Sequence, residues 1–121
     1  MNLDELLDRT FAAAEAGDWQ TFRSMFADDA VLRQNVGAEQ PIDVAMNYLP
    51  RYTADGTTLR YENVRRVLGT TGATEMHDAV FTKPDGREVR IDICVVVQVN
   101  DAGKIVRTDE YLDSAAASAL A

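Results

Sequence analysis

Asp78 and Glu110 are well placed for acid–base chemistry, because each lies in a segment where apolar and polar residues alternate. Such alternation is typical of a strand with one buried face. Asp78 shares its expected face with Met76 and Val80, and Glu110 shares its face with Leu112. A carboxyl group among apolar side chains loses hydration, so its charged form is disfavoured and its pKa rises.

Two such carboxyl groups in one cavity would interact, so that one stays protonated while the other is ionised. This pair could add water to a substrate, with the carboxylate taking a proton from water and the acid protonating the departing oxygen. It could equally abstract and return a proton in an aldol cyclisation. A third interpretation is that both are solvated strand residues of an acidic protein.

The strand expected between them, at residues 89–99, separates into two faces. Arg90, Asp92, Cys94 and Gln98 lie on one face, and valines and isoleucines fill the other. We expect the apolar face to line a pocket for a small apolar molecule. The expected substrate-binding residues are Met76, Val80, Ile91, Ile93 and Leu112.

Helical and extended segments are separated along the chain. Apolar spacing and capping residues predict helices at 2–17, at 18–28 and at 41–52, where Pro50 distorts or ends the third helix. A strand is expected at 30–36, and further strands at 58–69, 73–82, 89–99 and 105–112, before a short helix or frayed tail. This order predicts an α+β fold in which helices cover one face of a curved antiparallel sheet and leave a pocket between the layers.

Composition is typical of one globular domain spanning 1–121. Twelve Lys plus Arg against twenty Asp plus Glu give a net charge of −8, which opposes binding to nucleic acid or to an anionic membrane. A single cysteine and a single histidine predict no internal disulfide and no structural zinc site, and we expect neither a metal nor a cofactor. The longest apolar run is five residues, at 93–97, and the N-terminus is acidic, so we expect a cytoplasmic protein.

Three segments carry a family resemblance: Ala16-Gly17-Asp18-Trp19, Phe26-Ala27-Asp28-Asp29-Ala30-Val31 and, after a Gly103 turn, Asp109-Glu110-Tyr111-Leu112-Asp113. They resemble the SnoaL-like branch of the nuclear transport factor 2-like (NTF2-like) superfamily over nearly the whole chain. The resemblance implies a cone-shaped fold, with N-terminal helices on a curved antiparallel sheet that encloses a pocket. That fold hosts isomerases, cyclases, dehydratases, hydrolases and dimerisation modules.

Within the superfamily, the chain resembles limonene-1,2-epoxide hydrolase. That family uses an Asp-Arg-Asp set, with a Tyr and an Asn that hold the attacking water. Its Tyr-Gln-Asn segment resembles residues 33–35, which puts Asn35 at the water-holding position and Arg33 in place of Tyr. Its Thr-Glu-Arg-x-Asp strand resembles residues 74–78, which puts Asp78 at the proton-donating position and Met76 in place of Arg. Its final Asp-Tyr-Phe-Asp resembles residues 110–113, so Glu110 matches the water-activating Asp.

Arg33 is the expected replacement for the missing cation, because it shares a strand face with Asn35 and could bridge Asp78 and Glu110 from there. The alternatives are that Arg33 is a solvated strand residue and that Asn35 is a turn residue. The expected activity is an epoxide-hydrolase-like hydrolase acting on a small apolar substrate.

Two other functions stay open, a SnoaL-type polyketide cyclase and a non-catalytic ligand-binding or dimerisation module. Ketosteroid isomerase is excluded on residues, because its base and oxyanion-hole positions fall at Gln34, Thr10 and Val95.

His77 faces away from its neighbour Asp78 on an alternating strand, so we expect it at the surface or at a subunit interface, where alanine would be tolerated. A homodimer is expected through the convex face of the sheet. That face would carry Arg90, Asp92, Gln98 and Tyr111.

Overall fold

A computed structural model describes residues 1–120. Six strands form one sheet in the order β2-β1-β6-β5-β4-β3. β1 and β6 are parallel, and the other neighbouring pairs are antiparallel. The elements are α1 (Leu3–Ala16), α2 (Trp19–Ser24), β1 (Phe26–Gln34), β2 (Gln40–Pro41), α3 (Ile42–Ala45), the 3-10 helix η1 (Leu49–Thr53), β3 (Thr58–Leu68), β4 (Gly72–Thr82), β5 (Glu88–Val99), β6 (Ile105–Leu112) and α4 (Ser114–Ser118).

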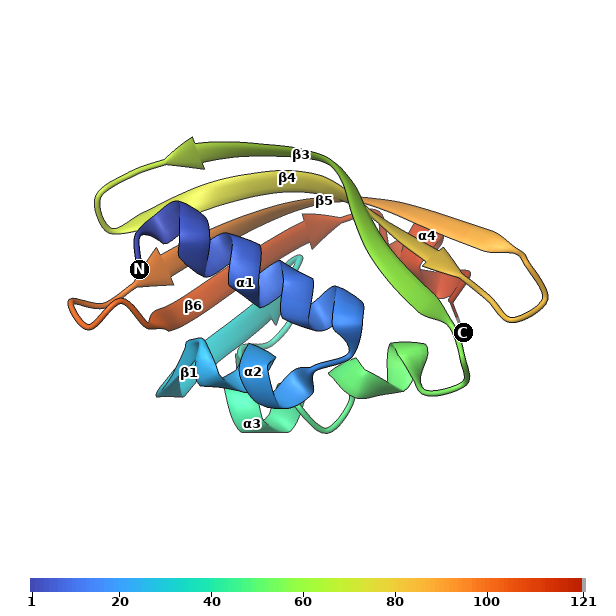
Figure 1. The fold of residues 1–121 in the computed structure, drawn as a ribbon, viewed down its shortest axis with the longest axis horizontal. Helices are drawn as coiled ribbons and strands as arrows, with labels where there is room; N and C mark the ends of the chain where they lie inside the picture. The colour runs from blue at the N-terminus through green and yellow to red at the C-terminus, as the bar shows by residue number, and fades with distance from the viewer. Residues whose placement is uncertain (121) are drawn as a thin grey trace.

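The helices lie against a curved sheet (Figure 1). α1 lies across its concave side and packs on β3, α3 packs on β1, and α4 packs on β5. The expected α+β architecture, with N-terminal helices over a meander of β3 to β6, is confirmed.

Local signals define the first two helices as expected. Asn2 Oδ1 accepts a hydrogen bond from the Glu5 amide at 2.8 Å, which satisfies a free donor at the start of α1. Gly17 ends α1 with φ of 70°, a conformation that glycine adopts without steric cost. The Asp18 carboxylate accepts from the Thr21 amide at 3.1 Å and caps α2.

Two boundaries differ from expectation. α2 ends at Ser24, and β1 already begins at Phe26, so Asp28 and Asp29 lie inside a strand. Both are exposed, so the strand carries them without burying charge. The expected third helix is split into α3 and η1, and Pro50 lies in the first turn of η1, where no helical N–H is needed.

Side chains of the sheet alternate between an inner face, which the helices cover, and an outer face. On β5 the residues Ile91, Ile93, Val95 and Val97 point inward as expected, in phase with Val89, and this face pairs with one set of residues on β4. That inner-facing set is Ala73, Glu75, His77, Ala79 and Phe81. No helix within residues 1–120 is long and apolar enough to cross a membrane.

Candidate active site

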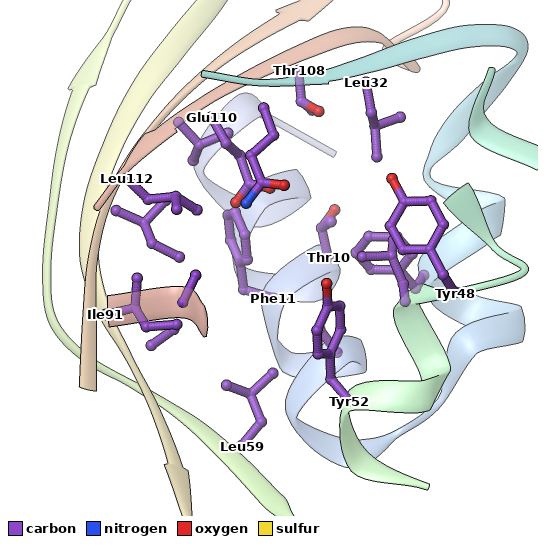
Figure 2. A pocket seen from close by; sticks show the side chains of 18 of the residues that line it. Thr10, Phe11, Leu32, Tyr48, Tyr52, Leu59, Ile91, Thr108, Glu110 and Leu112 are labelled. Atoms are coloured by element: carbon purple, nitrogen blue, oxygen red, sulfur yellow. The ribbon is translucent and has the colours of Figure 1, made fainter. Parts of the chain in front are cut away.

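A cavity of about 340 Å³ lies between the inner face of the sheet and the helices. Most of its lining is apolar, and Ile91, Ile93 and Leu112 contribute to it. Tyr48 and Tyr52 supply hydroxyl groups from the helical side, and Thr10 and Thr108 supply two more. In Figure 2 the two tyrosine hydroxyls point into the cavity opposite Glu110. The cavity therefore suits an apolar molecule with few polar atoms.

Glu110 is the one carboxylate that lines this cavity among residues 1–120. It lies on β6 between Thr108 and Leu112, and its side chain points into the cavity (Figure 2). Burial raises its pKa above the ordinary value of 4.5, and the charge of His77 acts in the opposite direction. A carboxyl group with a raised pKa can act as acid and as base near neutral pH.

A second polar group lies on the inner face of β4, behind the lining of the cavity. Glu75 and His77 are 0% and 2% exposed. Glu75 Oε2 lies 2.5 Å from His77 Nδ1, and Glu75 Oε1 accepts from Arg66 Nε of β3 at 2.6 Å. One buried carboxylate is thus contacted by a guanidinium and an imidazole, as a buried charge requires.

Tyr61 of β3 completes this polar group. Its ring centroid lies 4.4 Å from that of His77. Burial and, after it, the charge of Glu110 raise the pKa of Tyr61, so its hydroxyl stays protonated. Tyr61 also lines the cavity, which brings the β4 group and Glu110 into one neighbourhood.

A family model for the SnoaL-like domain matches residues 7–108. The chain belongs to the SnoaL-like domain family. A search of curated proteins finds none that matches this sequence.

Solved structures agree with this SnoaL-like fold. A proposed isomerase from Bacillus subtilis has a TM-score of 0.82 at 15% identity, over 99% of this chain and 95% of that one. A proposed polyketide cyclase from Xanthomonas campestris pv. campestris has a TM-score of 0.80 at 16% identity, over 98% and 95%. An LEH-like epoxide hydrolase of M. tuberculosis has a TM-score of 0.73 at 18% identity, over 96% and 86%. At such identities the likeness shows the fold alone.

Asp78 does not lie in the cavity of this SnoaL-like domain, so the expectation that it shares one with Glu110 is wrong. It lies on the outer face of β4, where its carboxylate accepts from Asn63 at 2.7 Å and from Arg90 at 3.1 Å. The Asn63 hydrogen bond, among other contacts, lowers the pKa of Asp78. Its outer-face neighbour Asp92 has a raised pKa because it hydrogen-bonds to Asp78 and is repelled by its charge.

Met76 and Val80 share that outer face and do not line the cavity, contrary to expectation. Val80 is nevertheless fully buried, between the paired positions of Arg60 and Arg90. Ile91, Ile93 and Leu112 do line the cavity, and their contact with a substrate stays a prediction.

Arg33 does not bridge two carboxylates. Its Nε donates to the Gly37 carbonyl at 3.1 Å. In the pairing of β1 with β6, Arg33 lies beside Asp109 and Gln34 lies beside Glu110. The Arg33 side chain therefore leaves the sheet on the same face as Asp109, opposite to Glu110. Part of Arg33 still contributes to the cavity wall. The expected relocated cation is therefore wrong for this residue.

Asn35 has a structural role. It adopts a left-handed conformation with φ of 53°. Its backbone N–H donates to the Glu110 carbonyl oxygen at 2.7 Å, and its side-chain Oδ1 accepts from the Leu112 backbone N–H at 3.0 Å. This side chain fastens the end of β1 to β6, so its amide oxygen is already engaged rather than free to hold a water.

Sequence reasoning missed Glu75 and His77. The signal that could have found them is the alternation through Ala73, Ala79 and Phe81, which is in phase with both residues. The match to the family motif placed Asp78 on the cavity side of β4, whereas the structure has His77 there. A shift of one residue along a strand moves every side chain to the opposite face. His77 is buried on the inner face, not at the surface as expected.

No group of three or more His, Cys, Asp or Glu that could hold a metal occurs within the described residues. The arrangement of Glu110 and the hydroxyl groups that line the cavity would suit proton transfer with hydrogen-bond donors nearby.

Proposed function

We propose that this SnoaL-like domain is an enzyme that transfers a proton on a small apolar carbonyl compound, with Glu110 as acid and base. The observation that carries the proposal is one buried carboxyl group in a mostly apolar cavity that also presents tyrosine hydroxyls. The cavity volume of about 340 Å³ fits a molecule of one or two rings.

In the proposed step, the Glu110 carboxylate removes a proton from the carbon beside the substrate carbonyl. The C–H electrons form the enolate double bond, and negative charge develops on the carbonyl oxygen. Tyr48 or Tyr52 donates a hydrogen bond to that oxygen, and the pKa of Tyr48 is raised by burial, so its hydroxyl keeps its proton. Protonated Glu110 then returns the proton to carbon, which gives an isomerisation or an exchange.

The same enolate supports a cyclisation. If its carbon attacks a second carbonyl of the substrate, a C–C bond forms and the new alkoxide takes the proton from Glu110. This second outcome corresponds to the polyketide cyclase alternative. Both outcomes use only acid–base groups of the protein.

Epoxide-hydrolase-like hydration is the second candidate, favoured by the position of Glu110 near the end of the last strand. The Glu110 carboxylate could take a proton from the attacking water. A second group must then protonate the departing epoxide oxygen, and within the described chain no second carboxyl group lines the cavity. We therefore rank epoxide hydration behind proton transfer on a carbonyl compound.

The test is a panel of apolar cyclic ketones, 1,3-diketones and epoxides incubated in D₂O and followed by NMR. The proposal predicts deuterium incorporation beside a carbonyl with the wild type and its loss, by about 10²- to 10⁴-fold, in Glu110→Gln. Asp78→Asn is the matched control, because it removes a carboxylate from the outer face.

Diol formation from epoxides without exchange would establish the second candidate instead. Tight binding of panel members with neither reaction would indicate a non-catalytic ligand-binding module. Exchange that Glu110→Gln leaves unchanged would contradict the assigned role of Glu110.

A further inference from the structure

Arg66, Glu75 and His77 form a continuous chain of contacts from the protein surface to the inner face of the sheet. We propose that these three residues are a positioning relay that sets the protonation state of Glu110 in the cavity. The relay deepens the proposed function, on which its catalytic consequence rests. Its electrostatic effect is a property of the resting protein.

The outer end of the relay is fixed by charge. Arg66 Nη1 lies 2.7 Å from carboxylate oxygens of both Asp4 and Asp8 at the start of α1. Arg66 and Glu75 also line a cleft between α1 and β3, so solvent reaches this end. The guanidinium holds Glu75 by a hydrogen bond of 2.6 Å.

The inner end of the relay is fixed in orientation. The His77 ring packs edge-on against Phe11, with centroids 5.0 Å apart, and against Tyr61. An ionised carboxylate can only accept hydrogen bonds, so the Glu75 contact assigns the proton to Nδ1. Any change in the charge of the ring must then occur at its other nitrogen, Nε2.

Glu110 lies on the same inner face, two strands away, with β5 between. Val95 of β5 pairs with Glu75 on one side and with Glu110 on the other. Ile93 likewise pairs with His77 and with Leu112. Because both groups are withdrawn from solvent, a charged His77 imidazolium favours the carboxylate form of Glu110, and a neutral imidazole no longer does so.

Other titratable or charged groups face this neighbourhood from each packed element. They are Glu15 on α1, Arg33 on β1, Tyr48 before η1, Tyr61 on β3, and Glu75 and His77 on β4. The two tyrosines have raised pKa values because of burial and nearby negative charge, so they stay neutral. Arg33 is turned toward Gly37 and Asp109. Among these groups, His77 is the one whose charge acts on the Glu110 carboxyl group.

This relay can be tested by NMR titration of the resting protein, with ¹³C-labelled carboxyl groups and ¹⁵N-labelled imidazole. In the wild type, the Glu110 carboxyl signal should show a second inflection at the pH where His77 loses its proton. In His77→Gln that inflection should disappear, and the main midpoint should rise by about 1 pH unit or more. Glu75→Gln should also move the midpoint, because it removes the carboxylate that holds the His77 ring at the inner face.

Asp78→Asn is the control, since it changes a carboxylate on the outer face of the same strand and should leave the Glu110 midpoint in place. A purely structural histidine would leave Glu110 with a single inflection in the wild type, and that result would overturn the relay. An unchanged midpoint in both folded variants would also overturn it. If His77→Gln does not fold, the wild-type titration and Glu75→Gln decide the question.

The titration needs no substrate, so it separates the relay from the proposed reaction. A linked titration of His77 and Glu110 without any catalysed exchange would support the relay and contradict the enzyme. Exchange without a linked titration would support the enzyme and contradict the relay.

Discussion

Glu75 Oε2 lies 2.5 Å from His77 Nδ1, on the inner face of β4, in a contact that excludes water almost completely. Arg66 contacts the other oxygen of the same carboxylate. The fold thus contains a buried carboxylate that Arg66 and His77 contact on its two oxygens, and removing this carboxylate has a clear energetic consequence.

Glu75→Leu should destabilise the fold by about 3–5 kcal/mol, because it leaves Arg66 and His77 without their shared carboxylate in a buried position. Denaturant unfolding followed by fluorescence measures this free energy. Asp78→Leu, on the outer face, should cost clearly less. Equal losses in the two variants would mean that the buried cluster contributes no more than a partly exposed ion pair.

Glu110→Gln should stabilise the protein at pH 7 and leave its stability unchanged near pH 4. Burial raises the pKa of Glu110 in the folded state, so below the ordinary value of 4.5 the carboxyl is protonated in both states. As the pH rises, Glu110 ionises first in the unfolded chain. The free energy of unfolding of the wild type then falls by about 1.4 kcal/mol for each unit by which the pKa is raised in the folded state. Thermal unfolding at both pH values measures the difference between variant and wild type. A variant less stable than the wild type at pH 7 would contradict burial of this carboxyl.

Ile91→Trp should abolish binding of apolar ligands, because the larger side chain fills the cavity from β5. Fluorescence titration with an apolar dye measures the loss of binding. The matched control is Val67→Trp on the edge strand β3, where the side chain is exposed. Equal binding by both variants would place the ligand elsewhere.

The sequence predicted the inner face of β5 because that strand is long and its two faces differ sharply in polarity. β4 was ambiguous, since each of its faces carries both charged and apolar residues: Glu75 and His77 are in phase with Phe81, and Asp78 is in phase with Val80. Because the outer-facing Val80 is fully buried, apolar content does not identify the cavity side. Only the pairing of β4 with β5 decides the face, and this pairing is a tertiary property.

The role of Asn35 could not be predicted from the sequence either. Its left-handed backbone and its contact with Leu112 depend on the parallel pairing of β1 with β6. These two strands are 70 or more residues apart in the chain. The helix caps at Asn2 and Asp18 could be predicted because each depends on residues within one turn.

We also expect a homodimer formed through the outer face of the sheet. Tyr111 on that face is 48% exposed, next to the half-buried Cys94 on the neighbouring strand. Tyr111→Asp should shift the mass measured by light scattering at micromolar concentration from dimer to monomer. A monomer mass for the wild type would contradict this expectation.

The most direct test of the central claim is the pH dependence of deuterium exchange into an accepted ketone. The claim is that Glu110 is the base in the cavity, so the rate should rise with pH above 4.5, as its buried carboxyl ionises. The Glu110→Gln profile should be flat and close to the rate without enzyme. A wild-type profile with no inflection above 4.5, or one that Glu110→Gln reproduces, would contradict the claim.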